Sequence, residues 1–251
     1  MISEPFANGN SLVHRLDPRV KILCVTVYSF AVALSNRFPA LAGYLVFSLV
    51  LIGLAQLNLR EVFSRILIVN AFILLLWVVL PLTFEGEPLF SIGPFTATRE
   101  GILTCAGITL KSNSILLAFI SLAATSSLSA LGSAMNRLHL PDKIVLLLLM
   151  TYRYVFVIEL EYQRLVRAAK IRGFSPKTDM HTYRTYAYLI GMIFVRSSDR
   201  SERVHKAMLC RGFKGKFYCI REFSFTRLDL IWSVFMTVAI VGLGLLELLN
   251  I

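Results

Sequence analysis

The chain has 251 residues, of which 56% are hydrophobic and only 16% are charged, and its mean hydropathy is +0.69. Soluble domains carry about 25% charged residues, and the apolar residues here come in blocks about as long as a bilayer is thick. The composition therefore excludes a soluble globular enzyme and indicates an integral membrane protein. Lysine and arginine outnumber aspartate and glutamate by 26 to 15, a net charge of +11, so the position of this charge bears on the topology.

Five segments are apolar enough to be predicted as membrane spans. A hydrocarbon core of about 30 Å needs about 20 helical residues at about 1.5 Å each. In chain order the segments are Val20–Asn36, Phe38–Leu57, Ile66–Phe84, Gly101–Ser127 and Leu230–Leu249. The first is the shortest, and the long side chain of Lys21 near its start is expected to reach the lipid headgroups.

Two further apolar runs are too short to cross a bilayer. They are Ile144–Tyr152 and Thr185–Val195, and the longer one has eleven residues, which cover only about 16 Å as a helix. We expect them to be faces of helices that pack on protein or lie at the membrane interface. The first run has few charges around it and is able to dip partway into the bilayer.

The distribution of charge predicts the topology. Residues 128–227 contain 18 Lys and Arg against 7 Asp and Glu, whereas the rest of the chain holds 8 of each. By the positive-inside rule this block is cytoplasmic. The short loops agree, because Arg60 and Arg65 flank the second turn, which would be inside, whereas the third loop, Glu85–Glu100, is acidic and would be an outer hairpin.

The expected fold is an all-α polytopic membrane protein with its N-terminus in the cytoplasm. About five transmembrane helices are expected, with cytoplasmic helices between the fourth and the fifth. The corresponding regions are residues 1–127 with four spans, residues 128–227 in the cytoplasm, and residues 228–251 with the last span.

Within the basic block one pattern occurs twice. Gln163-Arg164, Ala168 and Arg172-Gly173-Phe174 are matched, 39 residues later, by Glu202-Arg203, Ala207 and Arg211-Gly212-Phe213. Matches at six positions with identical internal spacing indicate an internal repeat.

The spacing of the pattern predicts the end of a helix. The first arginine, the alanine and the second arginine lie at i, i+4 and i+8, on one helix face. The glycine then stands at C′, the position where a left-handed residue ends a helix. Arg172 and Arg211 are thereby expected in a final turn, where a guanidinium can pair bidentately with a carboxylate. The alternative is a pair of basic surface helices, with Phe174 and Phe213 covering the helix ends.

The repeat and its setting resemble the transmembrane T component of energy-coupling factor (ECF) transporters, in particular the cobalt/nickel type, CbiQ or NikQ. In that family two short arginine motifs end the cytoplasmic coupling helices, and they correspond here to Ile171-Arg172-Gly173 and Cys210-Arg211-Gly212. Ile171 stands where the family often has alanine. The resemblance also covers Asp17-Pro18-Arg19-x-Lys21, the Glu-Gly-Glu-Pro sequence of the third loop, and the stretch from Ser201 to Met208, and so extends over most of the chain.

The resemblance implies a non-catalytic subunit of an ATP-driven importer for cobalt or nickel ions in the bacterial cytoplasmic (inner) membrane. Two cytoplasmic ABC-type ATPase subunits would each accept one coupling helix, and the motion would pass to a separate substrate-binding membrane protein, the S component. ATP and Mg would be bound by the ATPases and the metal by the S component, so this chain needs no cofactor. Membrane lipids are further partners, and no nucleic acid is expected. The residues implied in ATPase coupling are Arg164, Ala168, Arg172, Gly173, Arg203, Ala207, Arg211 and Gly212.

The chain itself shows no motif for ATP or metal binding. It has no G-x-x-x-x-G-K-[ST] sequence, and its four cysteines form no C-x-x-C pair. The histidines, at positions 14, 139, 181 and 205, have no partner at i+3 or i+4, the spacing that brings two ligands to one helix face.

Two other transporter classes stay open as alternatives. A conventional importer permease carries Glu-Ala-Ala-x-x-x-Gly in its cytoplasmic loop, and Ala168-Ala169-x-x-x-Gly173 matches it except that Arg167 replaces the glutamate. A self-contained secondary transporter would have ionisable groups at mid-membrane depth in paired halves. Lys111 is the intramembrane ionisable group here, and it suits either helix packing or a direct role in coupling.

Overall fold

The computed structural model describes residues 9, 11–83, 88–92, 95–138, 140–215 and 225–249. These residues form two compact units, which are treated separately. The first, called the apolar bundle, comprises the described residues up to 131 together with 225–249. The second, called the crossed pair, comprises residues 132–215.

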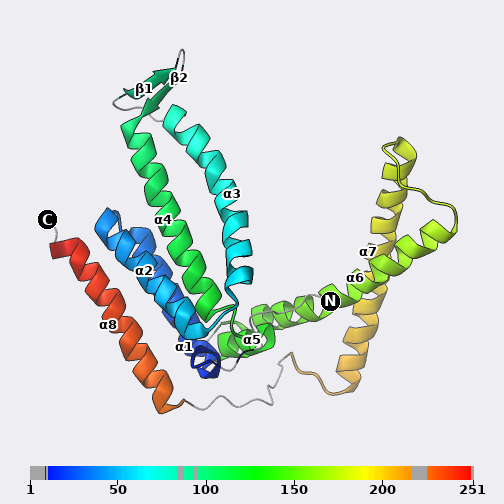
Figure 1. Ribbon diagram of the computed structural model, residues 1–251. Coiled ribbons are helices and arrows are strands. Elements are labelled where there is room, and N and C mark those ends of the chain that lie inside the picture. The colour runs from blue at the N-terminus through cyan, green and yellow to red at the C-terminus, as the bar shows by residue number, and fades with distance from the viewer. Residues whose placement is uncertain are drawn as a thin grey trace. The chain divides into compact units, whose positions relative to one another are not determined.

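The apolar bundle is built around one central helix. Its elements are η1 (Val13–Arg15), α1 (Pro18–Leu34), α2 (Phe38–Ala55), α3 (Leu59–Thr83), β1 (Pro88–Ile92), β2 (Phe95–Thr98), α4 (Arg99–Leu122) and α8 (Arg227–Leu249). Helix α4 packs against α1, α2 and α3, and α8 packs against α1 and α2 (Figure 1). Helix α5 (Leu128–Arg137) follows α4 and leads into the second unit.

Local sequence accounts for several helix boundaries. The carboxylate of Asp17 accepts a hydrogen bond from the backbone N–H of Arg19, 2.9 Å away, and Pro18 occupies the first helical position of α1, where a missing N–H costs nothing. Helix α2 ends at Gln56, whose φ of +50° is left-handed. Within the third loop, strands β1 and β2 pair in antiparallel fashion, as expected for a hairpin. Residues 84–87 and 93–94 lie outside the described residues.

Among the described residues, four of the predicted spans form helices long and apolar enough to cross a membrane. They are α2, α3, α4 and residues 227–245 of α8. Helix α1 occupies the first predicted segment, but its 17 residues reach only about 25 Å. The prediction of a helical, multi-pass membrane protein is therefore confirmed, with the short β1–β2 hairpin as an addition to it.

The core of the bundle buries aromatic rings and, unexpectedly, a lysine. The hydroxyl of Tyr28 donates to the backbone oxygen of Tyr44 at 2.6 Å, and the two rings meet edge to face. Lys21 is only 1% exposed, and its ammonium donates to Ser126 Oγ at 2.9 Å and Thr125 Oγ1 at 3.3 Å. The prediction that Lys21 reaches the headgroups is wrong, because the turn after α4 supplies hydroxyl acceptors inside the bundle.

The main elements of the crossed pair are two long helices, α6 (Asp142–Ile171) and α7 (Met180–Cys210), which cross each other (Figure 1). Asp179 begins α7 by accepting a hydrogen bond from the Thr182 N–H at 2.9 Å. Hydrogen bonds from the side chain and the backbone of Thr182 hold the pKa of the Asp179 carboxyl below its usual value. Helix α6 contains the whole of the first short apolar run, and α7 contains the second.

Several large side chains of the two short runs are exposed within this chain, although Val145 of the first run is buried. In the first run Leu147 is 66% exposed, and in the second Phe194 is 73% and Val195 58% exposed. Within this chain the two runs are thus only partly covered, and the prediction that they pack on protein or lie at the membrane interface stays a prediction. Their apolar surface is available to lipid or to another protein.

Candidate functional site

Both copies of the repeated motif end a helix with the same backbone geometry. Gly173 has a φ of +87° and Gly212 a φ of +78°, a conformation that glycine adopts without steric cost. After α6, the N–H of Gly173 donates to the oxygen of Lys170 and the N–H of Phe174 to that of Ala169. This pair of bonds is the Schellman motif.

The second helix end repeats these bonds atom for atom. The N–H of Gly212 donates to the oxygen of Leu209 at 2.9 Å, and the N–H of Phe213 to that of Met208 at 3.0 Å. The predicted C′ glycines are confirmed in both copies. Arg172 and Arg211 are consequently the C-cap residues of α6 and α7, and both side chains are exposed.

Two equivalent grooves lie between α6 and α7. The first has a volume of about 480 Å³ and the second about 580 Å³. The first is lined from α6 and its end by Leu165, Ala168, Ala169, Arg172, Gly173 and Phe174. The second is lined from α7 and its end by Val204, Ala207, Met208, Arg211, Gly212 and Phe213. Each residue of the second set follows its counterpart in the first by 39 positions, so the sequence repeat is also a structural repeat.

The phenylalanine of each motif folds back toward the groove. The Phe174 ring stands edge to face with Tyr186 at a centroid distance of 5.7 Å and lies 6.5 Å from the ring of His181. Phe213 lines its groove together with Met208 and Tyr154. The phenylalanines therefore form part of the apolar lining of the grooves, whereas Arg172 and Arg211 are exposed to solvent.

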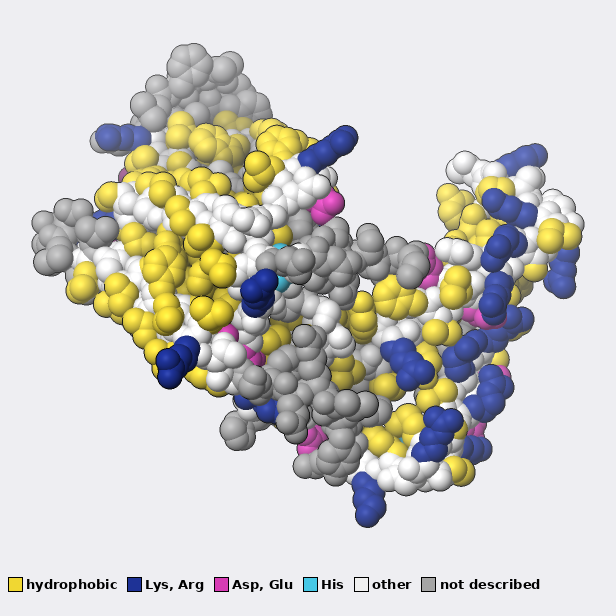
Figure 2. All heavy atoms as spheres, turned by 60° about the horizontal axis from the view of Figure 1, so that its bottom comes forward, with side chains coloured by type: hydrophobic (Ala, Val, Ile, Leu, Met, Phe, Trp, Pro, Cys, Tyr) yellow, Lys and Arg dark blue, Asp and Glu magenta, His cyan; other side chains and the backbone are white. Residues whose placement is uncertain are grey.

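The surface of the crossed pair is strongly basic. Figure 2 shows lysine and arginine side chains gathered over α6 and α7, whereas hydrophobic side chains dominate the visible face of the apolar bundle. The first groove carries Arg196 beside Arg172, and the second carries Arg153 and Lys214 beside Arg211. Each groove therefore suits a partner that presents carboxylates.

The two outer arginines of the motif have different surroundings. Arg164 lies 3.7 Å from the carboxylate of Glu161, one turn earlier on α6. Arg203 is exposed on α7 and, like Arg164, lines neither groove. The structure thus brings Ala168, Arg172 and Gly173 together, and likewise their counterparts on α7, but it separates the first arginine of each motif from the helix end.

Glu161, which the sequence did not single out, lies where the helices cross. Its side chain is 13% exposed and forms ion pairs with Arg196 and Arg200 of α7 as well as with Arg164. The hydrogen bond from Arg196, reinforced by the charges of the other two arginines, holds the pKa of Glu161 below its usual range. The sequence offered one signal for this ion pair. Glu161 and Arg200 stand 39 residues apart, so they occupy equivalent positions of the repeat and carry opposite charges.

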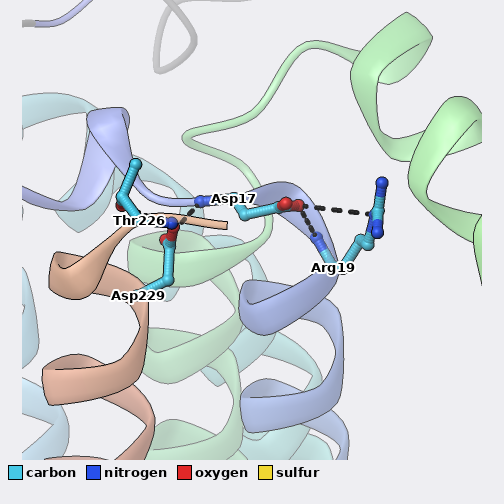
Figure 3. Close-up of polar contacts among 4 residues, drawn as sticks. All are labelled: Asp17, Arg19, Thr226 and Asp229. Carbon is cyan, nitrogen blue, oxygen red and sulfur yellow. Dashed lines mark hydrogen bonds and ion pairs between the residues drawn. The ribbon is translucent and has the colours of Figure 1, made fainter. Parts of the chain in front are cut away.

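A second polar cluster, in the apolar bundle, was also missed. The Asp229 carboxylate accepts from the backbone N–H of Asp17 at 2.8 Å and from the N–H and hydroxyl of Thr226 at 2.9 and 2.6 Å (Figure 3). Asp229 is 1% exposed. It therefore caps its own helix, α8, and joins it to the start of α1.

Lys111 of α4 serves the opposite end of α1. Its ammonium donates to the backbone oxygen of Ala33 at 3.0 Å and to Asn36 Oδ1 at 2.9 Å. The backbone N–H of Asn36 in turn donates to the carboxylate of Glu247 in α8, at 2.9 Å. An acidic group of another helix is thus linked to Lys111 through Asn36, which the sequence did not indicate. No group of three or more His, Cys, Asp or Glu able to hold a metal ion occurs among the described residues.

A bundle of apolar helices and a separate basic helix pair with two matching ends define a multi-pass membrane protein with a duplicated helix-end motif. The CbiQ family model, described as a cobalt transport protein, matches residues 9–219. The chain therefore belongs to the CbiQ family.

The relatives carry a more specific description. The chain is 30% identical over 221 residues to the energy-coupling factor transporter transmembrane protein EcfT of Acidaminococcus fermentans, covering 82% of this chain and 81% of that protein. It is 29% identical over 221 residues to EcfT of Leuconostoc gelidum, covering 83% and 82%. For EcfT of Bacillus subtilis the identity is 26% over 228 residues, covering 86% and 85%. The resemblance to the ECF T component is confirmed, and this argues against the two alternative transporter classes.

Proposed function

We propose that this chain is the T subunit of an ATP-driven ECF importer for cobalt or nickel ions, a subunit without catalytic activity of its own. Two cytoplasmic ABC-type ATPase subunits hydrolyse ATP, and the chain transmits their motion to a separate S component that holds the metal. The description of the matching family supports the metal, and the names of the relatives support the ECF assembly.

The observation that carries the proposal is the equivalence of the two grooves. Two identical helix ends, 39 residues apart, suit two similar sockets on a pair of related subunits. In each socket a carboxylate would pair with Arg172 or Arg211, for which the planar guanidinium provides a fork of donors. Because both arginines are exposed C-cap residues, a partner reaches them without rearrangement of the helix.

The proposed orientation follows from charge. The crossed pair and the N-terminus lie in the cytoplasm of a bacterial cell, the chain is embedded in the inner membrane, and basic side chains near the membrane contact anionic lipid headgroups. The β1–β2 hairpin then lies outside and has no catalytic task.

The test is co-purification of the ATPases with an Arg172→Ala/Arg211→Ala variant, together with metal uptake. Loss of one member of a buried interfacial ion pair costs roughly 2–5 kcal/mol, about 30-fold or more in affinity, so the double variant is expected to lose the ATPases. Lysine at both sites should rescue only in part, because it restores the charge without the fork. Full retention of the ATPases with normal uptake would overturn the proposal.

A matched control is available in the chain. Arg167 and Lys206 are exposed, stand 39 residues apart like the motif arginines, and line neither groove. The Arg167→Ala/Lys206→Ala variant removes the same charge from the same helices and should retain both ATPases and uptake.

A further inference from the structure

The crossing point of α6 and α7 coincides with the centre of the structural repeat. Glu161 and Arg200 occupy equivalent positions, 39 residues apart, and they form an ion pair with each other at 3.8 Å. Contact between equivalent positions of two repeats is what a local two-fold axis produces. The grooves on either side of the crossing are equivalent for the same reason.

The two helix ends are equally far from this crossing. Arg172 follows Glu161 by eleven positions, and Arg211 follows Arg200 by eleven, which is about 16 Å along each helix. Any change in the crossing angle therefore moves both motif arginines by similar amounts in opposite senses.

The carboxylate of Glu161 lies at this crossing and has three arginines around it. Arg196 and Arg200 approach it from α7, and Arg164 approaches it from α6 itself. At 13% exposure the carboxylate is more shielded from water and salt than a surface pair, so its attraction to the guanidinium groups is less screened. Without the carboxylate, three positive charges would face one another where the helices meet.

We propose that Glu161 is the pivot of the crossed pair, a positioning residue that fixes the crossing angle and so couples the movement of the helix end at Arg172 to that of the end at Arg211. Glu161 contacts neither groove and is not itself a docking residue. It sets the spacing of the two docking ends, and so it affects how much of the ATPase motion reaches transport. The effect of Glu161 on transport rests on the proposed function, whereas its effect on the crossing angle does not.

The first experiment measures the spacing in the full-length chain in lipid nanodiscs without any partner. Ile171 and Cys210 are equivalent positions next to the two motif arginines, and both are exposed. Spin labels on Ile171→Cys and Cys210, with Cys24, Cys105 and Cys219 replaced by serine, report the distance between the helix ends. Glu161→Gln should broaden or shift the distance distribution, and Glu161→Arg should do so more strongly.

The repeat offers a direct rescue. In the exchange variant Glu161→Arg/Arg200→Glu, the acid at position 200 faces an arginine at 161 and keeps Arg196 and Arg203 nearby on its own helix. The native distance distribution should therefore return. Glu159→Gln, the same substitution two residues earlier on α6, is the control and should leave the distribution unchanged. An unchanged distribution in both Glu161→Gln and Glu161→Arg, or a failure of the exchange to restore it, would overturn the pivot.

The second experiment measures metal ions transported per ATP hydrolysed in the assembled, unlabelled transporter. Glu161→Gln should retain the ATPases and their hydrolysis but lower the transport ratio about fivefold or more, in the range of typical coupling energies. The exchange variant should recover the ratio. If Glu161→Gln shifts the distances but leaves this ratio unchanged, the pivot has no role in coupling and that part of the proposal is overturned. If instead the ATPases bind regardless of Arg172 and Arg211, the proposed function fails while the distance result stands.

Discussion

The backbone N–H of Asp17 donates to the carboxylate of Asp229, although 212 residues separate them in the chain. The same carboxylate accepts hydrogen bonds from Thr226 and so caps the N-terminus of α8. One buried side chain therefore stabilises the start of α8 and connects it to the start of α1. Because α8 follows the crossed pair in sequence, this joint anchors the chain where it re-enters the bundle.

We expect Asp229→Ala to destabilise the bundle. The substitution leaves the buried N–H of Asp17 without an acceptor and removes the cap of α8, a loss of about 1–3 kcal/mol. The melting temperature of the purified chain in detergent should fall clearly, and that of Asp229→Asn should fall less, because an amide oxygen still accepts. Equal melting temperatures for wild type and Asp229→Ala would show that the joint adds no stability.

The left-handed glycines should resist substitution for a backbone reason. A Cβ added at Gly173 or Gly212 meets no atom within 4 Å, so the cost of alanine comes from the positive φ alone, about 1 kcal/mol or more at each position. We expect Gly173→Ala/Gly212→Ala to distort both helix ends and weaken ATPase co-purification, while the bundle's melting temperature is unchanged.

Gly191 provides the contrast for this experiment. It lies inside α7, where an added Cβ also meets no atom within 4 Å but the φ is not positive. Alanine is favoured over glycine in a helix interior by about 1 kcal/mol, so Gly191→Ala should keep co-purification intact. Equal losses in both variants would mean that the helix-end geometry is irrelevant to docking.

The ion pairs of Glu161 should give the crossing a defined pH dependence. The pKa of this carboxyl is held below its ordinary value of 4.5, chiefly by the hydrogen bond from Arg196. The stabilisation is therefore fully present above about pH 4.5 and is lost as the pH falls through the lowered pKa.

The measurement is the Ile171–Cys210 label distance as a function of pH. From pH 8 to pH 5 the wild-type distribution should be constant and distinct from that of Glu161→Gln. As the pH falls through the lowered pKa of Glu161 it should approach the Glu161→Gln distribution, which itself should not change. A wild-type transition near pH 6 would assign the effect to a histidine instead.

Lys111 is expected to stabilise the end of α1 rather than to carry coupling. Its ammonium lies against the backbone oxygen of Ala33, at the negative end of the helix dipole, an interaction worth about 1 kcal/mol. Lys111→Met should lower the melting temperature, and Lys111→Arg should largely retain it. Metal transported per ATP in the assembled complex should be the same for all three proteins, and a selective loss of transport in Lys111→Met would point to direct coupling.

The sequence alone determined the features that depend on neighbouring residues. Apolar length identified the segments that became α2, α3, α4 and α8, because a span is set by about 20 consecutive side chains. The helix ends at Gly173 and Gly212 were predictable for the same reason, since a left-handed C′ residue is a local requirement of the backbone. The 39-residue repeat likewise predicted that the two ends would match.

Only the tertiary structure decided which distant polar groups meet. Lys21 is near the start of an apolar segment and was expected to reach the headgroups, yet hydroxyls more than 100 residues later hold it inside the bundle. Glu161 looks like any acid on a basic helix until the crossing brings Arg196 and Arg200 to it. Such pairs depend on the angle and register at which helices pack, and neither hydrophobic periodicity nor capping residues along one helix contain that information.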